Sequence, residues 1–382
     1  SVRRGGGVAE ILRRFLVLLG DLGLEVRWEV IEGPPPFFEL TKSIHNGLQG
    51  QEVSIPDSMW ELYRVTNEEN ARRLDLEADF VIVHDPQPAP LVEHRRPGGI
   101  WVWRCHIDAS SPQRNVWRVL RDHVTRYDAA IFSLSQFYHR LSTPAFIINP
   151  AIDPLSEKNC AIAPQEVDAI TERLGVPRDK PLLLQVSRFD RFKDPLGVIQ
   201  AYQLVKKRLD CRLVLAGGTA ADDPEGEEVL AQVREAARGD PDIHILLLPP
   251  TAHREINALQ RAADVVIQKS TREGFGLTVS EAMWKGKPVV AGHAGGLILQ
   301  VVYGRTGYTV TSVEGCAYRI QLLLNHPRRR RELGYFAQEH VRARFLVTRL
   351  LADYMALLRM LEQRRRRPRA VGGPWPGPSP TS

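Results

Sequence analysis

The sequence has few features that would suit a membrane or an oxidising compartment. It contains no apolar run near the roughly 20 residues that a membrane-spanning helix needs, and no secretory signal is visible. Its only cysteines stand far apart, without paired or zinc-type spacing: Cys105, Cys160, Cys211 and Cys316. We therefore expect free thiols, no bound metal, no membrane association and a reducing, cytoplasmic setting.

The chain also lacks the charge pattern of a dedicated nucleic-acid binder. Its net charge is +6, and part of the excess lies in two runs, Arg328–Arg331 and Arg364–Arg367. Neither run is accompanied by a basic-aromatic RNA motif or a zinc spacing. The first run is typical of a surface helix and the second of a terminal tail. We expect no specific nucleic-acid partner, and salt-dependent binding to random DNA would test the alternative.

The length of 382 residues predicts two domains. Short apolar runs alternate with helical patterns in two series, and several runs lack polar alternation, as strands buried on both faces do. The runs of the first series are EVRWEVI near 25, FVIVHD near 80, IWVWRCH near 100, AAIFSL near 129 and AFIIN near 145. The five runs of the second series begin near residues 181, 211, 243, 263 and 287. Repeated βαβ units predict an α/β protein with two doubly wound, parallel-sheet domains.

Proline-rich residues 149–159 indicate the domain boundary. We predict a first domain of residues 1–150 completed by a terminal helix, 346–363, and a second domain of residues 151–345. The Pro/Gly/Ser-rich segment 364–382 is expected to be disordered. At the other end, SVRRGGGVAEIL reads as a glycine loop entering a helix with no strand before it. We therefore expect the first sheet to lack one strand.

The stretch TREGFGLTVSEAMWKGKPVVA, from residue 271 to 291, holds the most specific motif. Glu273 precedes a glycine turn, a helix is expected to begin near Leu277, and Glu281 follows one turn later. Free amides at a helix start favour an anion, and carboxylates accept hydrogen bonds from paired sugar hydroxyls. A favourable charge at the helix start would explain Glu281 alone, but not both glutamates with the glycines.

Cations follow the predicted strand near 181, where VSRFDRFKDP places Arg188 and Lys193. Because ligands of doubly wound sheets bind at the carboxyl ends of strands, this pair suits a diphosphate. A solvated basic loop is equally compatible with it. Gly6 and Gly7 at the start of the first helix suit a phosphate too, although a flexible linker explains them as well.

Polar clusters also follow two neighbouring strands of the first series. VHDPQP carries Asp85 and Gln87, and WRCHIDASSP carries His106. Either cluster alone could be a capped strand end with satisfied polar groups. Two clusters at adjacent strand ends favour a ligand site at the edge of the first domain.

These motifs resemble those of a known family. EGFGLTVSE is similar to the E-x7-E motif of retaining glycosyltransferases of family four, SRFDRFK resembles their donor-diphosphate motif, and GGGV their glycine loop. Longer phrases, among them HNGLQG, VHDPQP, WRCHIDASSP and IDPLSEKN, resemble the trehalose synthase group. The resemblance covers essentially the whole chain and implies the GT-B fold, in which two Rossmann-like domains face each other across a cleft.

The resemblance also implies a reaction and its site. A nucleoside-diphosphate glucose (ADP-, UDP- or GDP-glucose) donates glucose to free glucose, giving α,α-trehalose reversibly, with retention, without a metal or other cofactor, in a homodimer. By this resemblance, Arg188 and Lys193 bind the leaving diphosphate, and Glu273 and His106 contact the donor glucose. Glu281 binds the ribose, and Asp85 and Gln87 place the acceptor. Backbone amides that contribute to donor binding are those of Gly6, Gly7, Gly274, Phe275, Gly276 and Leu277.

This sequence departs from the family pattern at Asp194, which follows Lys193 where glycine is common, and at His293 in AGHAGG. Those departures leave the base of the donor open. Alternatives are a trehalose phosphorylase that uses inorganic phosphate, another sugar-nucleotide transferase, and a protein that binds a sugar nucleotide without turnover. The phrases around Asp85 and His106 argue against another sugar-nucleotide transferase.

Overall fold

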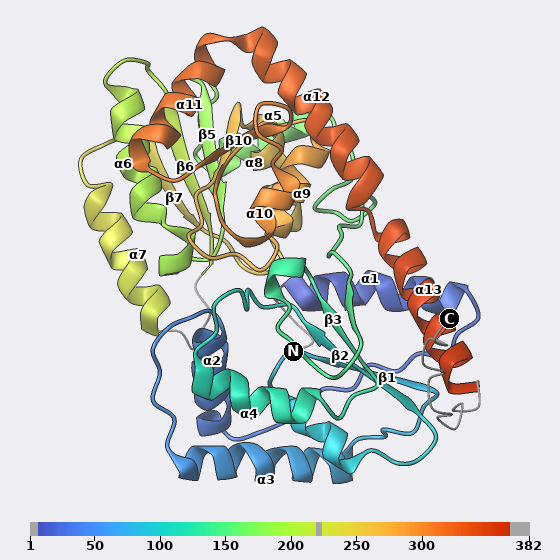
Figure 1. The fold of residues 1–382 in the computed structure, drawn as a ribbon. Helices are drawn as coiled ribbons and strands as arrows, with labels where there is room; N and C mark the ends of the chain where they lie inside the picture. The colour runs from blue at the N-terminus through green and yellow to red at the C-terminus, as the bar shows by residue number, and fades with distance from the viewer. Residues whose placement is uncertain (1–6, 219–223, 367–382) are drawn as a thin grey trace, which may run out of the picture.

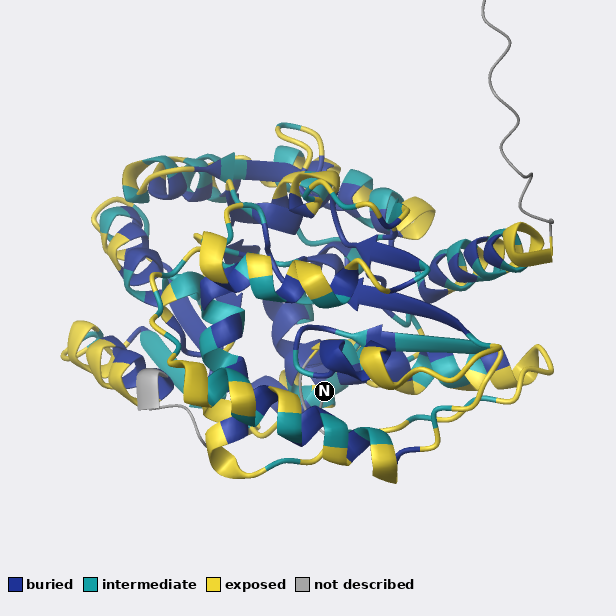
Figure 2. Cartoon of the chain, turned by 60° about the horizontal axis from the view of Figure 1, so that its bottom comes forward, coloured by how far each residue is buried: buried dark blue, intermediate teal, exposed yellow. Residues whose placement is uncertain are grey.

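The computed structural model describes residues 7–218 and 224–366. The chain forms two α/β domains, one above the other in Figure 1. This confirms the predicted fold class of two Rossmann-like domains with parallel sheets. Figure 2 shows buried strands in the interior of both domains and exposed residues on the outer faces of the helices. No helix of the described ranges has the length and apolar character to cross a membrane.

The first domain is built on a parallel sheet in the order β1-β2-β3-β4. Its strands are β1 (Phe80–His84), β2 (Ile100–Cys105), β3 (Ala129–Phe132) and β4 (Ala145–Ile147). Its helices are α1 (Gly7–Asp21), α2 (Pro35–Leu48), α3 (Asp57–Arg73) and α4 (Arg114–Val124), with short 3-10 segments at Ala89–His94 and Ser135–Phe137. Every residue of β2 is buried, Arg104 included, which explains why its first four residues, IWVW, are apolar without alternation.

The two faces of this sheet are covered by different helices. Trp101 and Trp103 pack with Phe37 of α2 on one face, whereas Val102 packs with Leu12 of α1 on the other. Helix α13 (Val347–Arg366) lies beside α1, and its Tyr354 shares the cluster on α1's face. The terminal helix therefore packs on the first domain.

The second domain has a parallel sheet in the order β10-β9-β8-β5-β6-β7. Its strands are β5 (Leu182–Val186), β6 (Arg212–Gly217), β7 (Ile243–Leu247), β8 (Val265–Gln268), β9 (Val289–Gly292) and β10 (Gly307–Val310). Its helices are α5 (Pro164–Arg173), α6 (Pro195–Lys206), α7 (Pro224–Ala236), α8 (His253–Ala262), α9 (Leu277–Trp284), α10 (Gly295–Gln300), α11 (Val313–Asn325) and α12 (Pro327–Arg344), with a 3-10 turn at Arg191–Lys193.

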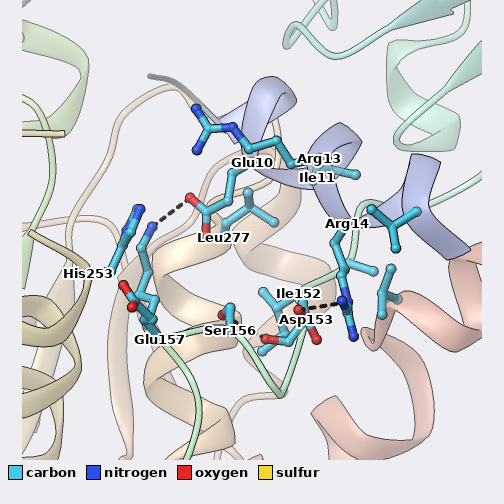
Figure 3. Close-up of a pocket in the computed structure, with 14 residues that line it drawn as sticks. Glu10, Ile11, Arg13, Arg14, Ile152, Asp153, Ser156, Glu157, His253 and Leu277 are labelled. Atoms are coloured by element: carbon cyan, nitrogen blue, oxygen red, sulfur yellow. Dashed lines mark hydrogen bonds and ion pairs between the residues drawn. The ribbon is translucent and has the colours of Figure 1, made fainter. Parts of the chain in front are cut away.

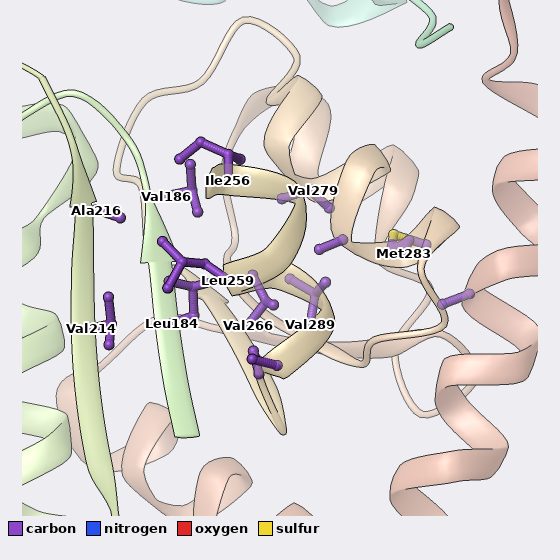
Figure 4. Packing of buried hydrophobic residues seen from close by; sticks show 14 of the residues in the cluster. Leu184, Val186, Val214, Ala216, Ile256, Leu259, Val266, Val279, Met283 and Val289 are labelled. Atoms are coloured by element: carbon purple, nitrogen blue, oxygen red, sulfur yellow. The ribbon is translucent and has the colours of Figure 1, made fainter. Parts of the chain in front are cut away.

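One core of this domain, shown in Figure 4, fills the space between the sheet and helices α8 and α9. Leu184 and Val266 from neighbouring strands meet Leu259 of α8 and Val279 of α9. The opposite face is closed by α6 and α11. Because both faces are covered, the motif-bearing loops at the carboxyl ends of the strands are held by a packed scaffold.

Two predictions of local structure were wrong. The segment near 25 forms no strand: Val26 and Trp28 do pack inward on alternate positions, but side chains bind its backbone. Arg73 Nη2 donates to the carbonyl of Val30 (2.8 Å), and just beyond the segment Asn70 accepts from the amide of Glu32 (2.8 Å) and donates to its carbonyl (2.6 Å). Helix α13 runs through Arg366, so Arg364–Arg366 are helical and not part of a disordered tail; residues 367–382 lie outside the described ranges.

Candidate active site

The centre of the second sheet brings the two predicted motif loops together. Strands β5 and β8 are neighbours although far apart in sequence, so the order of the sheet reverses between them, which is where doubly wound folds bind ligands. The loop after β5 carries Lys193 and the loop after β8 carries Glu273. Lys193 Nζ lies 2.7 Å from Glu273 Oε2, with 17% and 10% of the side chains exposed.

The backbone around Lys193 is fixed on both sides. Its amide donates to Asp190 Oδ1 (3.1 Å), and its carbonyl accepts from Gln185 Nε2 (2.8 Å). Asp194 follows with a left-handed φ of 49°, a conformation that aspartate tolerates better than most residues. Its carboxylate caps α6 through Gly197 N (3.1 Å) and pairs with Lys269. Aspartate thus fits a position where glycine is common.

Arg188 is the more exposed cation of this loop, with 60% of its side chain accessible and Asp190 as its ion-pair partner at 3.1 Å. His45 of α2, in the first domain, faces the same cations. Burial and the Arg188 charge lower the pKa of His45 to about 4, with Lys193 adding to the effect. His45 was not predicted as a site residue because it stands on a helix and not at a strand end; the HNGLQG phrase was its only signal.

Glycines bring the loops of the two domains into contact. A side chain at Gly274 would collide with the carbonyl oxygen of His106, and Gly276 needs its left-handed φ of 85° to start α9. Nearby, Arg272 Nη1 donates to Ser110 Oγ at 3.2 Å. The polar cluster after β2 and the motif after β8 therefore face each other, as the GT-B resemblance implied.

His106 is part of a buried histidine pair. Its Nε2 lies 3.0 Å from His84 Nδ1, and the two rings stack with centroids 5.2 Å apart. Burial, reinforced by the Arg104 charge, lowers the pKa of His84 to about 3 and that of His106 well below its usual value. Both imidazoles are therefore neutral near pH 7, and one donates a hydrogen bond to the other.

Asp85 supports this pair from the end of β1. Its backbone is left-handed, with φ of 67°, and its Oδ1 accepts from the amide of His106 at 2.8 Å. Burial raises the pKa of Asp85 to about 6, against the opposing effect of that hydrogen bond. Gln87 contributes a carbonyl that accepts from Asn67 Nδ2 at 3.1 Å, and its side chain is half-buried.

Glu281 has different neighbours from Glu273. Only 1% of its side chain is exposed, and its nearest cation is Lys158 Nζ at 3.4 Å. Lys158 also donates to Glu10 Oε2 on α1 at 2.6 Å. Burial raises the pKa of Glu281, and Lys158 opposes that shift. Sequence reasoning missed Lys158 and Glu10, whose importance depends on packing between segments 148 positions apart.

Two helix starts meet beside these carboxylates. Gly7 opens α1 and Leu277 opens α9, and a Cβ added at Gly7 would lie 3.1 Å from Leu277 Cδ1. Two converging helix N-termini favour an anion. Gly6 lies outside the described residues. The Phe275 ring packs against Phe345 with centroids 5.4 Å apart, so this residue has only its backbone to offer a ligand.

A cavity of about 260 Å³ adjoins Glu281's partners. It lies between α1, residues 151–158 and the first residues of α8 and α9. Figure 3 shows Glu10, Arg13 and Arg14 of α1 on one side and His253 and Leu277 on another. Among the described residues, no cluster of three or more His, Cys, Asp or Glu side chains could hold a metal ion.

Comparison with known sequences gives matches over both domains. The family description "Trehalose synthase, N-terminal domain" matches residues 1–139, and "Glycosyl transferases group 1" matches residues 166–340. Trehalose synthase of Pyrococcus horikoshii is 45% identical over 94% of this chain and 88% of its own length. That of Rubrobacter xylanophilus is 44% identical over the same shares. Trehalose phosphorylase of Pleurotus pulmonarius is 29% identical over 89% of this chain and 54% of its own.

Solved structures share the fold at low sequence identity. Sucrose-phosphate synthase of Thermosynechococcus elongatus aligns with a TM-score of 0.72 at 20% identity, over 94% of both chains. Anabaena Alr3699/HepE, solved in complex with UDP and glucose, aligns with a TM-score of 0.67 at 19% identity, over 91% of this chain and 89% of that one.

Proposed function

This chain belongs to the trehalose synthase family and is a glycosyltransferase, and on that premise we propose that it makes α,α-trehalose reversibly from a nucleoside-diphosphate glucose and glucose, with retention of configuration. The observation that carries the proposal is the Lys193–Glu273 pair at the switch point of the second domain, opposite His106 of the first. A relative of the same fold has been solved with UDP and glucose.

In the proposed reaction, the bond between the donor's anomeric carbon and the β-phosphate oxygen breaks. The anomeric hydroxyl oxygen of the acceptor glucose bonds to that carbon on the same face, and its proton passes to the departing diphosphate. Lys193 and Arg188 neutralise the charge that grows on the diphosphate. The amides at the start of α9, Gly276 and Leu277, add to this, and each such donor contributes roughly 3 kcal/mol to the transition state.

The remaining site residues bind and orient the sugars. Glu273 accepts hydrogen bonds from hydroxyls of the donor glucose, and Glu281 from those of the ribose. His106, neutral at pH 7, exchanges hydrogen bonds with the transferring glucose and does not serve as a cationic acid. Asp85 holds the backbone of His106 and, with Gln87, places the acceptor. Gly6 and Gly7 complete the phosphate site from the first domain.

The main alternative is a trehalose phosphorylase, in which inorganic phosphate replaces the nucleotide. Identity favours the synthases, at 45% against 29% for the phosphorylase relative. The proposed role of Glu281 as a ribose ligand also favours a nucleotide, because a phosphorylase has no ribose to bind. A protein that only binds the sugar nucleotide would show binding without product.

The test is an incubation of glucose with ADP-, UDP- or GDP-glucose, read by NMR of the anomeric protons. We expect α,α-trehalose and the nucleoside diphosphate in equal amounts, with and without EDTA. An inverted linkage, or binding without product, would contradict the proposal. Light scattering would test the predicted homodimer. The cytoplasmic location, which we inferred from the free thiols, stays a prediction.

A further inference from the structure

Lys158 joins a helix of each domain through its ammonium group. Its Nζ donates to Glu10 on α1 (2.6 Å) and lies 3.4 Å from Glu281 on α9. A second ion pair, Arg14 to Asp153 at 3.3 Å, lies one turn further along α1. Figure 3 shows both ion pairs beside the cavity as dashed lines. The segment that links the domains is thus fastened to the same face of α1 twice.

The carboxylate of Glu281 is unusual among the described residues. Both of its oxygens are buried, and within the described ranges no well-formed hydrogen bond reaches either of them; Lys158 Nζ, 3.4 Å from Oε1, is the ion-pair partner. A buried carboxylate normally obtains such bonds. Two acceptors with spare capacity on one charged group fit two adjacent hydroxyls, each of which donates one hydrogen bond.

Lys158 decides whether that carboxylate keeps its charge. The charged groups that face Glu281 are Lys158, Glu10 and Lys285. Burial lowers the pKa of Lys285 to about 7, so near neutral pH it carries only part of a charge. Burial also disfavours the charge of Lys158, but Glu281 and Glu10 outweigh that effect and raise its pKa. Lys158 is therefore the cation that stays fully charged beside Glu281.

Resting on the proposed function, we propose that Lys158 is a positioning residue for nucleotide recognition: anchored by Glu10, it holds the Glu281 carboxylate charged and oriented for the two hydroxyls of the donor's ribose. Lys158 itself touches neither the reacting carbon nor the transferred glucose. Its loss should weaken nucleotide binding and leave turnover at saturating donor largely intact.

The proposal also predicts a pH signature. Without Lys158, burial raises the pKa of Glu281 further, so the carboxyl takes up a proton at a higher pH and loses acceptor strength. Nucleotide affinity should then fall, as pH decreases, at a higher pH in the variant than in the unaltered protein. A lysine that only stabilised the fold would not move this profile.

The experiment measures binding of ADP, UDP and GDP, and of their 2′-deoxy counterparts, to the whole chain by calorimetry. For Lys158→Met we expect about 10- to 100-fold weaker binding of the preferred nucleotide, the range that a hydrogen bond to a charged group contributes. The preference for the ribonucleotide over its deoxy form should largely disappear. Lys158→Arg, which keeps the positive charge, should retain part of the nucleotide affinity and part of the preference for the ribonucleotide.

The matched control is Lys180→Met. Lys180 also pairs with two carboxylates, Asp242 at 2.8 Å and Asp210 at 3.2 Å, but it lies at the opposite, amino-terminal edge of the second sheet. Its loss should leave the deoxy preference unchanged. If Lys158→Met does not fold, Lys158→Gln, which keeps a hydrogen-bond donor without the charge, carries the same test.

Two results would overturn the inference. An unchanged preference for ribonucleotides in the Lys158 variants would show that Lys158 does not act through the ribose. A loss confined to kcat would place Lys158 in the chemistry and not in nucleotide binding. Failure of the unaltered protein to bind any of the three nucleotides would instead overturn the proposed function, and this inference with it.

Discussion

The Lys193–Glu273 pair allows a sharp prediction for Lys193→Met, which removes the ammonium group and retains much of the side chain's length. Glu273 then keeps its hydrogen bond from Ser270 Oγ at 3.1 Å but loses its cation at 2.7 Å. Both side chains are mostly but not fully buried, so we expect a stability loss of about 1–3 kcal/mol, the cost of leaving one partner unpaired.

The effect on catalysis should be larger than the effect on the fold. Lys193 acts on charge that develops as the diphosphate leaves, so kcat should fall about 100- to 1,000-fold, as for loss of one preorganised donor. The assay is turnover at saturating donor and acceptor, paired with urea unfolding. Lys193→Arg, which keeps the charge, should be intermediate.

Lys206→Met is the control, because it removes a partly buried lysine from its aspartate partners, Asp210 and Asp242, at the opposite, amino-terminal edge of the same sheet. It should lose comparable stability while its kcat stays close to that of the unaltered protein. The reasoning is refuted if Lys193→Met and Lys206→Met lose kcat equally, or if Lys193→Met changes only the KM of the acceptor.

Three further predictions concern the rest of the site. Glu273→Ala should nearly abolish transfer without unfolding the chain, measured by turnover and circular dichroism; unimpaired turnover would remove its assignment to the donor glucose. Asp85→Asn should be more stable than the unaltered protein at neutral pH by at most about 3 kcal/mol, the worth of roughly two pKa units. Burial raises the folded-state pKa of Asp85 to about 6 from a usual 3.8. The free-energy cost of the buried charge therefore appears as pH rises from 3.8 to about 6 and is complete above that range. Asparagine suits the left-handed backbone, and equal stability of the two proteins in urea unfolding would contradict the cost assigned to the Asp85 charge. EDTA should leave the initial rate unchanged, and a loss that added Mg²⁺ restores would contradict metal-free transfer.

The loops of the candidate site were predictable because their signals are local. Glycine at 274 and 276, a helix start at Leu277 and a buried strand before them place Glu273 at a strand end without knowledge of the rest of the chain. Lys193 was predictable in the same way. That the two side chains meet follows only from the sheet order, which sets β5 beside β8.

Other features depend on packing that no short window of sequence contains. The alternation of Val26 and Trp28 predicts a strand near 25, but side chains of α3 bind the backbone at its end, Arg73 at Val30 and Asn70 at the following Glu32, where a neighbouring strand would have paired. Strand β10 was missed because in its sequence, GYTV, glycine and threonine alternate with Tyr308 and Val310, so that it gives no continuous apolar run. Lys158 stood in a phrase of the resemblance, yet its role emerges only when α1 and α9 lie on either side of it.

The most direct test of the account is the reverse reaction. Trehalose is incubated with the protein and with ADP, UDP, GDP or inorganic phosphate, and the products are separated by chromatography. The account predicts glucose and a nucleoside-diphosphate glucose with at least one of the nucleotides, and their relative rates rank the bases. Glucose 1-phosphate formed with inorganic phosphate alone would contradict it and assign the chain to the phosphorylases.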